Sequence, residues 1–75
     1  MKLSRFQELV EDEFGPDFAA IVLSDTRLDE LADRTPNELL AAGEDPKLIW
    51  QAICRQLAVP SERWQGINKT LRHAD

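Results

Sequence analysis

The chain has 75 residues, a net charge of −5 at pH 7 and a single cysteine. This length allows one domain, and one cysteine excludes an intramolecular disulfide, so we expect a small hydrophobic core without covalent cross-links. No apolar run is long enough to span a membrane, and the first residues do not form a secretory signal, which predicts a soluble cytoplasmic protein with no membrane association.

A first amphipathic helix is predicted to begin at Ser4, whose hydroxyl can accept a hydrogen bond from the amide of Gln7. Its apolar residues recur at helical spacing, with acidic residues on the opposite side. These apolar residues are Phe6, Leu9, Val10 and Phe14. Gly15 and Pro16 end this helix, and Pro16 can begin the next one.

Two shorter helical segments are expected to follow. In residues 16–24, a second apolar stripe begins with Phe18, Ile21 and Val22. Beyond residue 24 the same face would receive acidic residues, so the helical register breaks there. Residues 28–32 then form a separate helical turn, anchored by Leu28 and Leu31.

The middle of the chain contains two strong helix starts. Thr35 and Glu38 enclose Pro36 in a capping-box pattern, which predicts a short helix over residues 36–42. Gly43 ends that helix, and Asp45 is the expected N-cap of a helix that begins at Pro46. This later helix is predicted to be the most buried, with one apolar arc made of Ile49, Trp50, Ile53, Cys54 and Leu57.

The last segment follows Pro60, where Ser61 can cap a helix that contains Trp64, Ile67 and Leu71 at helical spacing. Gly66 weakens this helix. We therefore expect a helical domain over residues 1–64 and a C-terminal extension, 65–75, that is a frayed helix or disordered. With no strand pattern, the predicted fold is all-α, a small single-domain bundle of about five short helices packed at steep angles.

The residue types that catalysis and metal binding need are poorly arranged. Cys54 lies on the buried arc without a nearby histidine, which indicates an inert core thiol. His73 lies near the end of the chain, and the run of Glu11, Asp12 and Glu13 spreads around a helix. The sequence thus predicts no enzyme activity, catalytic residue, metal site, cofactor or small-molecule substrate.

Residues 36–57 also have the layout of a helix-turn-helix, with a glycine between a short and a longer helix. The recognition helix of such a motif needs basic or amide side chains near its N-terminus, whereas Glu44 and Asp45 lie there and would face phosphates. We therefore interpret this segment as a structural corner between helices.

The charge is uneven along the chain, and this points to the C-terminal part as a partner surface. Residues 1–46 carry four basic and twelve acidic residues, whereas residues 47–75 carry five basic and two acidic ones. The acidic part disfavours nucleic acid as a partner. The residues predicted to contact a partner are Arg55, Arg63, Trp64, Lys69 and Arg72. The alternatives are a basic strip that binds nucleic acid and a solvated face, and Trp64 can belong to the core or to an interface.

Several segments together resemble a known family: MKLSRF at residues 1–6, FG at 14–15, RT at 34–35, LAAGEDPKLIW at 40–50 and VPSERW at 59–64. They are similar to the short actinobacterial proteins called domain of unknown function 3046. The family has no assigned activity, catalytic residue or cofactor. Because some members are encoded near the recombinase RecA, the resemblance implies a DNA repair context. We expect a small protein–protein interaction or regulatory module, with a nucleic-acid-associated protein as the alternative.

Overall fold

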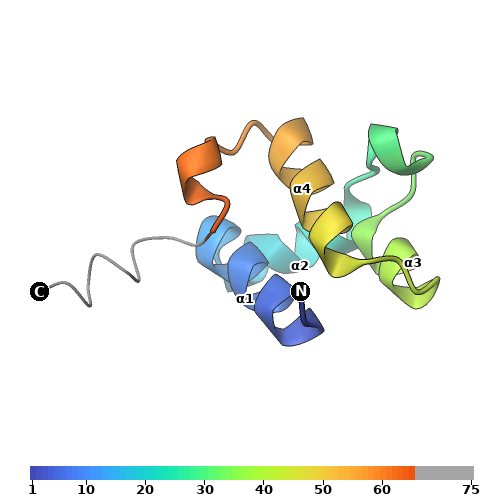
Figure 1. Ribbon diagram of the computed structural model, residues 1–75, viewed down its shortest axis with the longest axis horizontal. Coiled ribbons are helices and arrows are strands. Elements are labelled where there is room, and N and C mark those ends of the chain that lie inside the picture. Colours follow the sequence, from blue (N-terminus) through green and yellow to red (C-terminus); the bar gives the residue numbers. More distant parts are fainter. Residues whose placement is uncertain (66–75) are drawn as a thin grey trace, which may run out of the picture.

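The computed structural model describes residues 1–65, and this part of the chain is helical with short connections (Figure 1). It contains four α-helices and two single-turn 3-10 helices: α1 (Leu3–Phe14), α2 (Pro16–Asp25), η1 (Asp29–Leu31), α3 (Pro36–Ala41), α4 (Pro46–Gln56) and η2 (Ser61–Arg63). The all-α prediction is confirmed, but there are four α-helices here, not about five. The segment predicted at residues 28–32 contains one 3-10 turn, which is too short for an α-helix, and the segment predicted after Pro60 begins with another. The rest of that last segment, with Ile67 and Leu71, lies outside the described residues.

Two of the predicted helix starts are confirmed. Thr35 and Glu38 form a capping box, in which Glu38 N donates to Thr35 Oγ1 at 3.2 Å and Thr35 N donates to Glu38 Oε1 at 2.9 Å. At the start of α4, the Asp45 carboxylate accepts a hydrogen bond from Lys47 N at 2.9 Å. The Ser4 prediction is wrong, because α1 begins one residue earlier and Lys2 occupies the N-cap position.

The core is centred on α4, as predicted. In Figure 1 this helix lies between η1 and η2, which are on opposite sides of it, and it also contacts α1. Its buried face belongs to one apolar cluster with side chains from the other α-helices and from the connecting loops. The buried apolar residues are Phe6, Leu9 and Val10 from α1, Ala19 and Val22 from α2, Leu28, Leu39, Val59, and Ile49, Trp50, Ala52, Ile53 and Cys54 from α4.

The apolar stripe predicted on α2 is split between the core and the solvent. Val22 is buried, whereas Phe18 and Ile21 are each 51% exposed. Gly15 explains the difference, because its φ of 81° and its bonds to both helices set the direction in which α2 leaves α1. In that orientation Ala19 faces the core beside Val22, and the larger side chains point outward. Leu57, predicted on the buried arc of α4, is also 37% exposed.

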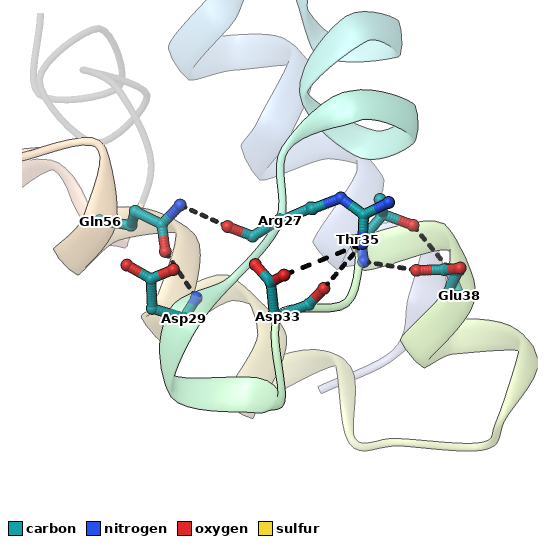
Figure 2. Close-up of polar contacts among 6 residues, drawn as sticks. All are labelled: Arg27, Asp29, Asp33, Thr35, Glu38 and Gln56. Carbon is teal, nitrogen blue, oxygen red and sulfur yellow. Dashed lines mark hydrogen bonds and ion pairs between the residues drawn. The ribbon is translucent and has the colours of Figure 1, made fainter.

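The loop between α2 and α3 is held by polar contacts (Figure 2). Gln56 at the end of α4 bridges two of its backbone groups, since its amide nitrogen donates to Arg27 O and its Oε1 accepts from Asp29 N at 2.9 Å. Within the loop, Leu28 N donates to Arg34 O at 3.0 Å and closes a small bridge. Leu28 is fully buried beneath it, which confirms its predicted role as an anchor.

None of the helices in residues 1–65 is long and apolar enough to cross a membrane.

Candidate functional site

The two tryptophans attach η2 to the rest of the domain. Trp50, which is only 2% exposed, donates from its indole nitrogen to Trp64 O at 2.7 Å. Trp64 is half-buried against the core and donates from its own indole nitrogen to Val59 O at 2.8 Å. Both indole N–H groups therefore have partners inside the domain, which fixes Trp64 beside the N-terminal half of α4.

A groove of about 320 Å³ opens between α1, α4 and the residues that follow η2. Its apolar part is formed by Leu9 from α1 together with both tryptophans, and it continues to the half-exposed side chain of Met1. The polar lining residues are Arg5, Lys47, Gln51 and Gln65. The groove is open to solvent on one side, and its volume suits one or two side chains of another molecule.

The charge of this groove differs from that of the whole chain. None of its lining residues within residues 1–65 is acidic, although the chain has 14 acidic residues against nine lysines and arginines. Arg5 pairs with Glu8 and donates to Gln65 O at 2.6 Å, which ties α1 to the end of the groove. Lys47 is exposed and takes part in none of the ion pairs found in residues 1–65. Lys47 thus leaves a positive charge at the groove.

The family model described as protein of unknown function (DUF3046) matches residues 1–62 of the chain. The chain belongs to this family. Comparisons with curated proteins and with solved structures found no match. The matched DUF3046 region includes α1 and α4, which form most of the groove, and it ends two residues before Trp64.

Arg55, one of the partner residues predicted from the sequence, lies beside Trp64. Its guanidinium carbon is 5.9 Å from the centre of the Trp64 ring, within range of a cation–π contact. It also forms an ion pair with Glu30, and the hydrogen bond from Arg55 lowers the pKa of that carboxyl group. Arg55 therefore connects η1, α4 and Trp64 within this DUF3046 domain.

Arg63 is bound in a similar way on the other side of η2. Its guanidinium donates to Glu13 at 2.8 Å, and the Glu13 side chain is only 8% exposed. The hydrogen bond to Glu13 raises the pKa of Arg63. Lys69 and Arg72, the other two predicted partner residues, lie outside the described residues. Of the three predicted residues that the structure describes, Trp64 lines the groove, whereas Arg55 and Arg63 are not among its lining residues.

The sequence reasoning missed the rest of the groove. Leu9 was assigned to the core, and Arg5 and Lys47 were assigned to no site. Leu9 and Lys47 are 38 positions apart in the chain, so no local pattern predicts that they share a surface. The one signal available was Lys47 itself, the only basic residue in the block AAGEDPKLIW.

The thiol of Cys54, the one cysteine of the chain, is held in an unreactive form. Cys54 is fully buried, and burial raises the pKa of its thiol to about 12, with a smaller contribution from Glu13. The thiol is therefore protonated at neutral pH. Within residues 1–65, no group of histidine, cysteine, aspartate or glutamate side chains is arranged to hold a metal ion.

Proposed function

We propose that this DUF3046 protein is a protein–protein interaction module that binds a short segment of a partner protein in the groove. The observation that carries the proposal is a groove with an apolar floor on an acidic chain, in which none of the described lining residues is acidic. Tryptophan-lined concave surfaces are frequent centres of binding energy in protein interfaces. The groove is also too small to accept a folded domain, which favours an extended segment or a helix end.

The chemistry of the groove describes the segment that would fit. An apolar side chain would enter between Leu9 and Trp64, where it would be removed from water. A carboxylate next to it would lie near Lys47, whose charge has no counter-ion in residues 1–65. Charge complementarity of this kind determines which partner is chosen and how fast it binds. The expected ligand is therefore an apolar residue flanked by aspartate or glutamate.

The ion pairs of the basic residues favour a protein partner over nucleic acid. Arg55 and Arg63, two members of the predicted basic strip, are each bound to a carboxylate of the same domain. Phosphate groups would have to compete with Glu30 and Glu13 for them, and the acidic surface of residues 1–46 would oppose their approach.

Selection of peptides from a displayed random library on the full-length protein tests the proposal. We expect enrichment of peptides in which an apolar residue is followed by an acidic one. Lys47→Glu should weaken their binding by about tenfold or more, because attraction at the rim becomes repulsion. Arg34→Glu is the matched control, since it makes the same charge change in the loop before α3 and should leave binding unchanged.

Two results would overturn the proposal. One is the selection of peptides whose binding is the same for Lys47→Glu and for the unsubstituted protein. The other is tight, steeply salt-dependent binding of duplex DNA in place of peptides, which would support the nucleic-acid alternative.

A further inference from the structure

We propose that the outward face of α2 is a second docking surface, which binds a basic amphipathic helix of a partner protein. Phe18 and Ile21 are each 51% exposed on this face. At helical spacing, they fall with Asp17 and Asp25 within an arc of about 100°. The surface thus consists of two large apolar side chains between two carboxylates, and we call it the α2 face.

No segment of residues 1–65 covers the α2 face, because the core is filled from another side of the helix. Ala19 and Val22 are buried against the core, so the opposite side must point to solvent. The half-buried ring of Phe14 meets Phe18 edge-on, with 5.8 Å between the ring centroids. This contact holds Phe18 in place, so the apolar surface is already formed before a partner arrives.

The two carboxylates determine the charge of the partner. Asp17 and Asp25 take part in none of the ion pairs found in residues 1–65. They are eight residues apart on one helix, which corresponds to about 12 Å. A partner helix that places leucine-like side chains on Phe18 and Ile21 would bring lysines or arginines two turns apart opposite these carboxylates.

Asp25 adds an argument from the stability of α2 itself. It lies in the last turn of the helix, where a negative charge opposes the helix dipole and no basic residue offsets it. Its carboxylate accepts a hydrogen bond from Ser24 Oγ at 3.2 Å. A cation from a partner would offset the unfavourable interaction between the Asp25 carboxylate and the helix dipole. Binding would therefore also stabilise the C-terminal end of α2.

The same charges argue against a second copy of this chain as the occupant. Antiparallel pairing of two α2 faces would place Asp17 of one copy near Asp25 of the other, at both ends of the contact. Like charges in such positions destabilise the pair. Residues 1–46 also carry a large excess of acidic residues, which repels a second copy and attracts a basic partner.

An NMR titration of the full-length, isotope-labelled protein tests this inference. The probe is a synthetic amphipathic helix with leucines on one side and lysines on the other, and the control peptide has glutamate in place of lysine. We expect the lysine peptide to shift the backbone amides of α2, and the glutamate peptide to shift none. Phe18→Ser together with Ile21→Ser should remove these shifts, and both changes are at exposed positions where the fold tolerates them.

A matched pair of charge variants separates a specific site from general attraction. Asp17→Asn with Asp25→Asn should weaken binding on the order of tenfold, from two exposed charge pairs. Glu44→Gln with Glu62→Gln changes the net charge equally at exposed positions outside α2 and should have little effect. Equal weakening by both pairs, shifts centred on the groove tryptophans, or a dimer in analytical ultracentrifugation would overturn the inference. Because Lys47→Glu leaves the α2 face unchanged, failure of the groove proposal would not affect this result.

Discussion

The two ends of α4 face regions that are built in opposite ways. At its C-terminal end, Gln56 bonds to two backbone groups of the loop between α2 and α3 (Figure 2), and Arg55 forms an ion pair with Glu30 of the same loop. At its N-terminal half, Lys47 and Trp50 line a groove that remains open to solvent. We call these regions the loop end and the groove end.

The comparison indicates where a partner is needed. The loop end is held by several hydrogen bonds of its backbone groups, and of its two leucines Leu28 is fully buried and Leu31 is partly buried against the core. The groove end has apolar side chains around a cavity and a lysine without a counter-ion in residues 1–65. A partner gains most by binding at such a surface, because its contact removes apolar side chains from water and gives the lysine a counter-ion.

Trp50→Ala should have the largest effect on stability and should disrupt the packing of the groove end. Trp50 is 2% exposed and its indole holds Trp64 in place, so the variant loses both a large core side chain and the attachment of η2. We expect the free energy of unfolding to fall by about 3 to 5 kcal/mol in urea denaturation. Leu48→Ala, two positions away and 50% exposed, is the control and should change it by less than about 1 kcal/mol. Similar losses in the two variants would show that Trp50 does not hold the core.

Two glutamines on α4 sharpen the comparison between the ends. Gln56→Ala removes two side chain–backbone bonds at the loop end and should lower the free energy of unfolding by about 1 to 2 kcal/mol, without changing peptide binding. Gln51→Ala, at the groove end, should change stability by less than about 0.5 kcal/mol but should weaken peptide binding. Denaturation and peptide titration of both variants check this pair. A destabilised Gln51→Ala with normal binding would reverse the assignment of the two ends.

Acid should loosen the loop end before the groove end. The hydrogen bond from Thr35 N lowers the pKa of Glu38, and the hydrogen bond from Arg55 lowers that of Glu30, both from a usual value of 4.5. A lowered folded-state pKa contributes stability above the unfolded-state value, and this contribution is lost as pH falls through the folded-state pKa. Amide hydrogen exchange on stepwise acidification should therefore show residues 28–38 losing protection before the core of α4. Glu38→Gln should reduce this difference, and simultaneous loss of protection at both ends would contradict it.

Local signals in the sequence predicted the parts of the fold that depend on neighbouring residues. The capping box of Thr35 and Glu38 and the cap at Asp45 were predictable, because the interacting groups are within three positions of each other. The Ser4 cap was wrong, because α1 already begins at Leu3, and its first backbone hydrogen bond runs from Phe6 N to Lys2 O.

The candidate site was only partly predictable, because its parts come from distant positions. Trp64 was proposed from its residue type, but its bond with Trp50 spans 14 positions. The ion pair between Arg63 and Glu13 spans 50 positions and has no signal in composition or spacing. The exposure of Phe18 depends on how Gly15 orients α2, which helical periodicity alone does not specify.

The most direct test of the central claim follows the indole N–H signals of Trp50 and Trp64 by NMR as a selected peptide is added to the full-length protein. These are the two tryptophans of the chain, and both line the groove. If a partner segment binds there, both signals shift with the same saturation curve, and Lys47→Glu moves that curve to higher peptide concentration. Binding that leaves both indole signals unchanged would contradict the claim that the groove is the partner site.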